Sequence, residues 1–228
     1  KTSATIYGGV FTSYNRTAVY VGNSGDGGIE EEAVVVIHGG TFSVTDTSDS
    51  TKYKGILYID YETDNCPVAE VFGGSFSDSL PEDVIAPGYG VSNKGGQFVV
   101  DAITPEEAAA SVETDGATLY FETLADAIDY VPEGGTVTLV NDCETNPIVI
   151  DKGNTLDLRE HTVTINDNDV DMFGIRFTAG ESLVRNGNIT DSRSDGTTGY
   201  NYIAVRVSGN DTSVTTQGVN ISTYEPGS

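Results

Sequence analysis

A short glycine motif recurs three times in the first hundred residues and constrains the fold more than any other feature. Its pattern is an apolar residue, any residue, Gly-Gly, a small residue, Phe and a hydroxyl residue, at positions 6–12, 37–43 and 71–77. The first glycines of the copies, Gly8, Gly39 and Gly73, are 31 and 34 residues apart. Such a period indicates stacked structural units, because one unit of this size cannot bury its own apolar face.

The intervals between the motifs contain short apolar runs separated by polar turns, for example at 33–37 and 55–59. A β-propeller blade would need about 40–50 residues with hairpin signals, and Asn-Gly or Asp-Gly turns are scarce here. The spacing favours a parallel coil in which Gly-Gly forms a corner, since glycine permits positive φ and close stacking. We therefore expect Phe11, Phe42 and Phe76 to stack as a column inside the coil.

The pattern changes near residue 101. A capping box that begins at Thr104 predicts a short helix over 104–110, and an amphipathic stretch capped by Thr123 predicts a helix over 123–131. Apolar runs predict strands at 117–121, 136–140, 148–150, 155–158 and 162–165. Degenerate copies of the glycine motif surround Gly187 and Gly218, which are again 31 residues apart.

These patterns predict an all-β fold, a right-handed parallel β-helix (a solenoid) with about 30 residues per coil and a short helical cap inserted midway. Residues 1–100 are expected to be the closing coils of a first module, with residues 80–100 as its closing cap. Residues 101–228 are expected to hold the capping helix and the opening coils of a second module. Since the pattern starts within a repeat and ends without a cap, we expect a monomeric fragment of a longer chain.

The charge of the chain restricts its partners. The formal net charge is −24, from 35 acidic and 11 basic side chains. Nucleic acid is excluded as a partner because phosphate binding needs a basic face, and anionic membrane surfaces are excluded for the same reason. No apolar run is long enough for membrane insertion. Cys66 and Cys143 are expected to be free thiols rather than a disulfide, because two distant cysteines in a stack of repeats seldom meet.

One stretch of the chain resembles a known family. It contains Leu-Tyr-Phe at 119–121, the helix pattern at 123–128, Gly-Gly-Thr-Val-Thr-Leu at 134–139, and Leu-Asp-Leu at 156–158 followed by His161 and Thr162. This order is similar to the opening of pectin-lyase-like β-helix modules in repetitive, adhesin-like surface proteins of gut Gram-positive anaerobic bacteria. The glycine motif and the segment 87–100 are similar to the recurring and closing units of those proteins. The resemblance implies an extracellular location, on the bacterial cell surface or secreted.

Tyrosines that lie near Asn, Asp and Gly are the candidate ligand-binding residues, because exposed Tyr with such neighbours commonly forms a sugar-binding or protein-binding face. The alternative is that half of these rings line the interior of the coil. His38 and His161 are expected to be structural. The candidate tyrosines are Tyr14, Tyr20, Tyr53, Tyr58, Tyr61, Tyr200 and Tyr202.

Alternating oxygen-bearing side chains at 166–171 make Asp167, Asp169 and Asp171 the candidate metal ligands, for Ca²⁺. The alternative is an acidic turn without a metal, because no Gly and Glu follow at EF-hand spacing. No other cofactor is expected. Arg176 and Arg206 are 30 residues apart, so we expect them to stack on one face. There the two cations would repel each other unless acidic side chains lie between them, and Asp157, Asp191, Asp195 and Asp211 are the candidates.

No catalytic residues are expected. A β-helix lyase needs a carboxylate cluster beside a basic side chain, and a hydrolase needs carboxylates paired across a cleft. The sequence has no Asp-x-Asp on a strand face flanked by an adjacent basic pair, which argues against a lyase. We expect a non-catalytic binding module of a bacterial cell-surface adhesin, which recognises a host glycan or a host protein such as an immunoglobulin through its corner loops. The alternatives are a polysaccharide-active enzyme (a lyase or glycoside hydrolase) and a passive surface stalk, because this fold serves all three roles.

Overall fold

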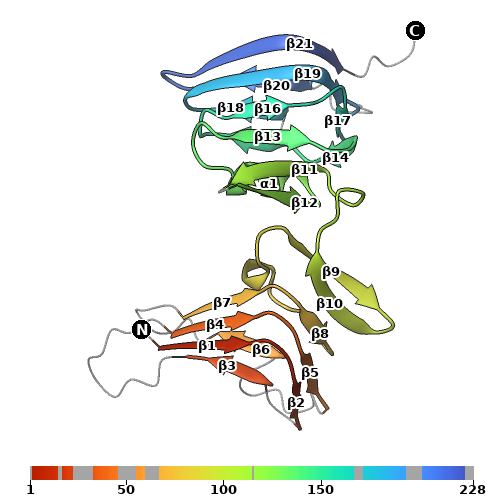
Figure 1. Ribbon diagram of the computed structural model, residues 1–228. Helices are drawn as coiled ribbons and strands as arrows, with labels where there is room; N and C mark the ends of the chain where they lie inside the picture. Colours follow the sequence, from red (N-terminus) through yellow and green to blue (C-terminus); the bar gives the residue numbers. More distant parts are fainter. Residues whose placement is uncertain are drawn as a thin grey trace. The chain divides into compact units, whose positions relative to one another are not determined.

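The computed structural model describes residues 2–14, 17–22, 33–45, 55–59, 67–114, 116–166, 172–193 and 202–223. Nearly all of the regular structure is β-strand, and the parallel strands stack as a β-solenoid of about six turns that are about 31 residues apart (Figure 1). The parallel solenoid predicted from the glycine spacing is thus confirmed. The chain divides into two compact units, Lys1–Ala102 and Ile103–Ser228, which we call unit 1 and unit 2.

Unit 1 consists of three small parallel sheets, one for each side of the coil. The first sheet contains β1 (Thr2–Ile6), β4 (Ala33–Ile37) and β7 (Val68–Val71). The parallel strands of the second are β2 (Val10–Ser13), β5 (Thr41–Val44) and β8 (Gly74–Phe76). The third contains β3 (Val19–Val21) and β6 (Leu57–Ile59).

The glycine motif forms the corner between the first two sheets. Gly40 and Gly74, the second glycines of their pairs, have φ of +125° and +133°. Residues other than glycine rarely adopt these backbone angles. The phenylalanines that follow form the expected column: Phe11 stacks on Phe42 with centroids 4.8 Å apart, and Phe42 stacks on Phe76 at 4.9 Å. Phe42 and Phe76 are fully buried. The motif therefore fixes both the bend and the core of each coil.

The segment after β8 ends the parallel stack of unit 1. It contains a 3₁₀ turn, η1 (Glu82–Val84), and a hairpin of β9 (Tyr89–Lys94) and β10 (Gln97–Ala102). Strand β10 pairs with β8 in the antiparallel direction. The hairpin thereby satisfies the hydrogen-bonding edge of β8, which an exposed coil would leave open.

Unit 2 begins with antiparallel strands and continues as a parallel solenoid. Strands β11 (Ala110–Thr114) and β12 (Ala117–Phe121) pair with each other, and β11 pairs with β13 (Thr136–Leu139). One side of the coil that follows contains β14 (Cys143–Thr145), β16 (Thr155–Asp157), β17 (Thr162–Ile165), β19 (Glu181–Asp191) and β21 (Ser213–Thr223). The other side contains β15 (Ile148–Ile150), β18 (Phe173–Phe177) and β20 (Ile203–Val207).

The α-helix α1 (Leu124–Tyr130) covers the beginning of this core as the amphipathic pattern predicts. Thr123 is its N-cap, and the Thr123 hydroxyl accepts a hydrogen bond of 3.1 Å from the backbone N–H of Asp126. Leu124, Ala127 and Ile128 are buried against the sheet. At the other end, the ammonium group of Lys152 donates to backbone carbonyl oxygens that the helix itself leaves unpaired, with the closest contact to Asp129.

The helix predicted over 104–110 is wrong. Only a turn forms there, in which the Glu107 N–H donates to the Thr104 carbonyl at 3.1 Å and the Thr104 hydroxyl donates to the Glu107 carboxylate at 2.9 Å. The chain then enters β11, where Ala110 lies between Phe121 and Leu139 of the neighbouring strands. Pairing on both sides within the sheet overrides the local preference for helix.

Gly187 and Gly218, which the 31-residue spacing places at equivalent positions, do not lie opposite each other in the structure. Strands β19 and β21 continue through both motifs, with Arg185 opposite Gln217, so Asn186 lies beside Gly218. Asn186 and Gly218 bend the strands with φ of +60° and +62°. Gly187 serves a different purpose, since a Cβ there would come within 2.4 Å of the Leu158 Cβ.

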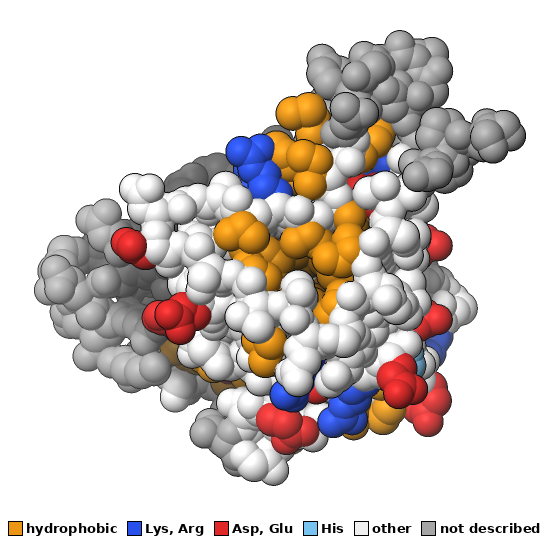
Figure 2. All heavy atoms as spheres, turned by 90° about the horizontal axis from the view of Figure 1, so that it is seen from above, with side chains coloured by type: hydrophobic (Ala, Val, Ile, Leu, Met, Phe, Trp, Pro, Cys, Tyr) orange, Lys and Arg blue, Asp and Glu red, His pale blue; other side chains and the backbone are white. Residues whose placement is uncertain are grey.

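The β20–β21 end of unit 2 exposes apolar side chains. Seen from above, hydrophobic side chains gather at the centre of this face (Figure 2). Val207 and Ile221 are each nearly half exposed there, at 48% and 47%. Separately, none of the helices in the described ranges is long and apolar enough to cross a membrane.

Candidate functional site

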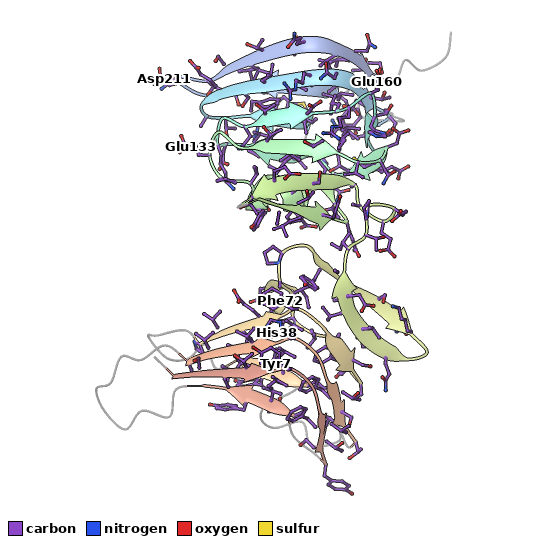
Figure 3. All side chains as sticks on the ribbon, viewed as in Figure 1. Tyr7, His38, Phe72, Glu133, Glu160 and Asp211 are labelled. Carbon is purple, nitrogen blue, oxygen red and sulfur yellow. The ribbon has the colours of Figure 1, made fainter. Side chains whose placement is uncertain are left out.

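An aromatic residue precedes the glycine pair in every copy of the motif. Tyr7, His38 and Phe72 directly follow strands β1, β4 and β7 and stack on the outside of unit 1; we call these three side chains the aromatic ladder. They lie one above another on successive coils (Figure 3). His38 and Phe72 follow the fully buried Ile37 and Val71, and Tyr7 follows the partly buried Ile6, so the alternation of side chains along the strand turns each ring outward.

The rings of the aromatic ladder are in face-to-face contact. The centroids of Tyr7 and His38 are 5.1 Å apart, with an angle of 10° between the ring planes. His38 and Phe72 are 5.0 Å apart at 26°. The rings of Tyr89 and Phe72 form a T-shaped contact, with centroids 5.3 Å apart and planes at 85°. These distances match the separation of parallel strands, about 4.8 Å, so the backbone register holds the stack in place.

The stacking determines which atoms a ligand can reach. Because the rings cover each other's faces, their outward edges carry the available polar groups, the Tyr7 hydroxyl and the His38 nitrogens. Tyr7 is 78% exposed, His38 is exposed and Phe72 is half-buried. The outer face of Tyr7 is the one ring face that no described ring covers. Aromatic bodies with polar tips are typical of recognition surfaces.

Glycine backbone borders the aromatic ladder. A Cβ at Gly8 would meet nothing within 4 Å, whereas one at Gly39 would lie 3.1 Å from the Tyr7 carbonyl oxygen and one at Gly73 would lie 2.7 Å from the His38 carbonyl oxygen. The absence of side chains therefore lets the coils approach closely enough for the rings to stack. It also leaves the ring edges unobstructed on the corner side.

The candidate tyrosines do not form one common surface. Tyr20 and Tyr58 stack on β3 and β6, with centroids 5.8 Å apart, and Tyr20 is 46% exposed. Tyr14 follows β2 and is 73% exposed. Tyr202 belongs to unit 2, where the Arg193 guanidinium lies 4.5 Å from its ring centre. The remaining candidates, Tyr53, Tyr61 and Tyr200, lie outside the described residues.

The candidate metal ligands Asp167, Asp169 and Asp171 likewise lie outside the described residues. Within the part of the chain that the structure describes, no group of three or more His, Cys, Asp and Glu side chains could hold a metal ion. Elsewhere in unit 2, Arg193 and Asp191 form a fully buried ion pair. The Arg193 guanidinium donates to both carboxylate oxygens of Asp191, at 2.9 and 2.8 Å.

Unit 2 has a polar surface depression of about 590 Å³ beside the turn between β16 and β17. Its lining includes Arg159 and Glu160, two successive non-glycine residues with φ of +43° and +70°. Asp157 supports this turn, because its carboxylate accepts hydrogen bonds from the Arg159 N–H, the Asn186 amide and the Arg185 guanidinium. Burial acts to raise the pKa of Asp157, but these hydrogen bonds and the Arg185 charge outweigh it and hold the pKa below its ordinary value.

A smaller acidic depression of about 290 Å³ lies near β14. Its lining includes Glu122, Asp142 and Glu144 and no Lys or Arg side chain among the described residues. The Thr162 N–H donates to Asp142 at 2.8 Å and lowers the pKa of that carboxyl, and the His161 imidazole, 3.2 Å away, lowers it further. Cys143 is free of any disulfide with a described residue, and burial raises the pKa of its thiol to about 11.

The aromatic ladder contains residues that the sequence analysis did not select. The repeat pattern leaves the position before Gly-Gly variable, and the sequence predicts only a structural role for His38. The signal is nevertheless present, because that position is aromatic in all three copies. Comparisons with protein-family models, with curated proteins and with solved structures found no match for this chain.

Proposed function

We propose that this chain is a non-catalytic binding module of a bacterial cell-surface or secreted adhesin, and that it recognises a host glycan through the aromatic ladder of unit 1. The exposed stack of Tyr7, His38 and Phe72 carries the proposal. Ring edges bearing a hydroxyl and an imidazole offer donors and acceptors to sugar hydroxyls, and the outer face of Tyr7 offers an apolar surface.

The scaffold supports this role because it holds the rings without a ligand. Tyr7 and His38 lie at the ends of strands that pair in a continuous parallel register, from Thr2 opposite Ala33 to Ile6 opposite Ile37. A site on regular strands is fixed more closely than one on loops, so less conformational entropy is lost on binding. The strand ends of the coil, rather than the corner loops expected from the sequence, are therefore the proposed contact surface.

The proposed extracellular location and the proposed bacterial origin of the chain are inferred from its sequence. The resemblance to repetitive surface proteins of gut bacteria favours an extracellular role, and a strongly acidic surface favours solubility outside the cell. The same acidity disfavours polyanionic glycans as ligands of unit 1, because long-range repulsion slows their association. A neutral host glycan is the ligand class that fits best.

A glycan array tests the proposal with the whole 228-residue chain. We expect saturable binding to a small set of neutral glycans, and loss of that signal in His38→Ala, which removes the middle ring. Tyr20→Ala is the matched control, because it breaks the other stacked pair, and it should leave binding unchanged. Binding to host proteins instead of glycans, or equal signals from both variants, would overturn the proposal.

The same glycans distinguish the two alternatives. A polysaccharide-active enzyme would release products from bound oligosaccharides during long incubation with Ca²⁺, detectable by mass spectrometry, whereas a binding module releases none. A passive stalk would bind neither glycan nor host protein. The acidic depression beside β14 lacks a lining Lys or Arg among the described residues, which is the basic group that lyase chemistry needs on the same face.

A further inference from the structure

Two arginines on neighbouring coils of unit 2 form a basic pair. Arg176 of β18 lies opposite Arg206 of β20 in the parallel register, as the 30-residue spacing predicts. Their Cα atoms are therefore about 4.8 Å apart. Neither side chain forms an ion pair with any residue that the structure describes. Like charges on directly opposite positions of paired strands are destabilising, and an anion bound between them would remove that cost.

The acids expected to separate the two arginines are engaged elsewhere or lie apart. Asp157 binds Arg185 at 2.8 Å, and the carboxylate of Asp191 binds Arg193 at the same distance. Asp211 lies on the exposed turn before β21, and Asp195 lies outside the described residues. An unpaired basic pair stands out on a chain with 35 acidic and 11 basic side chains.

The two guanidinium groups are held in place with their donors available. The Arg206 guanidinium lies 4.0 Å from the ring centre of Phe173, and stacking of this kind leaves its N–H groups free in the plane. Arg176 is half-buried, and its Nε is covered without a hydrogen-bond partner, so its terminal amino groups are the ones that solvent reaches. Val149, on the next coil below Arg176, is 41% exposed.

We propose that Arg176 and Arg206 bind a sulfate or phosphate monoester carried by a small saccharide. Two guanidinium groups match a tetrahedral group with three acceptor oxygens, whereas one arginine suffices for a carboxylate, as the Asp191–Arg193 pair shows. Exposed Ile203, at 41%, and Val149 provide apolar contact for the sugar ring. The net charge of −24 disfavours long polyanions and favours a ligand with one charged group.

A series of sugars that differ only at C6 tests this site: glucose, glucuronate, glucose 6-sulfate and glucose 6-phosphate, with inorganic sulfate as a fifth ligand. Backbone amide shifts of the ¹⁵N-labelled full chain are followed at low salt. We expect the two esters to shift amides of β18 and β20 and to bind at least tenfold more tightly than glucose or glucuronate. The ester that binds more tightly shows whether the site prefers a sulfate or a phosphate group. Binding should weaken steeply with added salt, since the pair is partly exposed.

Matched variants distinguish a specific contribution of Arg176 and Arg206 to binding from a general effect of net charge. Arg176→Gln and Arg206→Gln should each weaken binding of the preferred ester by about tenfold or more, because each removes charged hydrogen bonds. Arg159→Gln changes the net charge of the same unit equally and should bind like the wild type. The site does not depend on the aromatic ladder, so Tyr7→Ala should also leave it unchanged.

Each of four results would overturn the proposal or a part of it. The first is no shift at β18 and β20 with either ester, and the second is equal affinity for glucuronate and glucose 6-sulfate. The third is an equal loss of binding in Arg159→Gln and Arg206→Gln. Inorganic sulfate that binds as tightly as glucose 6-sulfate would refute the saccharide carrier. Amide spectra of the variants without ligand show whether each remains folded, and Arg206→Lys keeps the charge if Arg206→Gln does not fold.

Discussion

Tyr7 and His38 are separated by 31 positions in the sequence, yet their rings stack with centroids 5.1 Å apart and planes only 10° apart. The parallel register of β1 and β4 creates this contact, because it places Ile6 directly opposite Ile37 and thus aligns the next residue of each strand. Any aromatic side chain at this position of the repeat joins the same stack. The glycine period therefore determines the surface of the coil as well as its core.

Removal of a ring from the aromatic ladder should cost a modest amount of stability. We expect Tyr7→Ala to lower the free energy of unfolding of unit 1 by about 0.5–1.5 kcal/mol, the contribution of a stacked aromatic pair. Tyr14→Ala is the matched control, because Tyr14 is similarly exposed, at 73%, and stacks on no described ring. Urea unfolding followed by circular dichroism measures both. Equal effects of the two substitutions would show that the stack contributes nothing to stability.

The second glycine of each corner pair should be intolerant of a side chain, whereas Gly8, the first glycine of the first pair, should accept one. Gly74 has φ of +133°, and a Cβ there would lie 3.1 Å from the Phe76 ring. We expect Gly74→Ala to destabilise unit 1 by about 1–2 kcal/mol or more, since the left-handed backbone is strained for alanine. Gly8→Ala, which meets nothing within 4 Å, should change stability by less than about 0.5 kcal/mol. A neutral Gly74→Ala would refute the role of this corner.

These corners show how far the sequence predicts the fold. The repeat spacing was sufficient to predict the parallel solenoid and the column of Phe11, Phe42 and Phe76. A fixed period places the same residue type at the same point of each coil, so the phenylalanines stack. Local capping signals were less reliable. Thr123 begins a helix because α1 has an apolar face to bury. Thr104 begins only a turn, because Ala110 pairs with two neighbouring strands.

The surface sites were harder to predict than the core. Sequence spacing placed Arg176 beside Arg206, since both lie one period apart on paired strands. It did not reveal the aromatic ladder, because three different residue types at one position look variable until the register shows that their rings meet. Tyrosine abundance alone was a poor guide, since Tyr202 lies beside Arg193 in unit 2 while Tyr20 stacks on Tyr58 in unit 1.

The thiol of Cys143 should react slowly in the folded protein. Burial raises its pKa to about 11, from an ordinary value of 9.0, so little thiolate is present at pH 8. We expect Ellman's reagent to label the Cys66→Ala variant at least tenfold more slowly in buffer than in urea. The thiol has a higher pKa in the folded protein than in the unfolded chain. Its contribution to the free energy of unfolding is therefore complete below pH 9 and is lost as the pH rises from 9 towards 11. Cys143→Ser should lack that loss.

The carboxylate of Asp157 should stabilise unit 2 except in acid. We expect Asp157→Asn to lower the free energy of unfolding by about 1–3 kcal/mol at pH 7, since it weakens charged hydrogen bonds from Arg185. The folded pKa lies below the ordinary 3.8, so the difference from the wild type is full above pH 3.8 and shrinks as the pH falls further. Exposed Asp151 provides the control: Asp151→Asn should change the free energy of unfolding at pH 7 by less than about 0.5 kcal/mol. A difference for Asp157→Asn that persists at the lowest pH would contradict this.

The central claim, that the aromatic ladder is a glycan-binding surface, is tested most directly by one affinity ratio. The dissociation constant for the strongest neutral glycan on the array is measured by calorimetry for the wild type, His38→Ala and Tyr20→Ala. We predict that His38→Ala binds at least tenfold more weakly, while Tyr20→Ala stays within twofold of the wild type, with both variants folded. Equal affinity of all three proteins would contradict the claim.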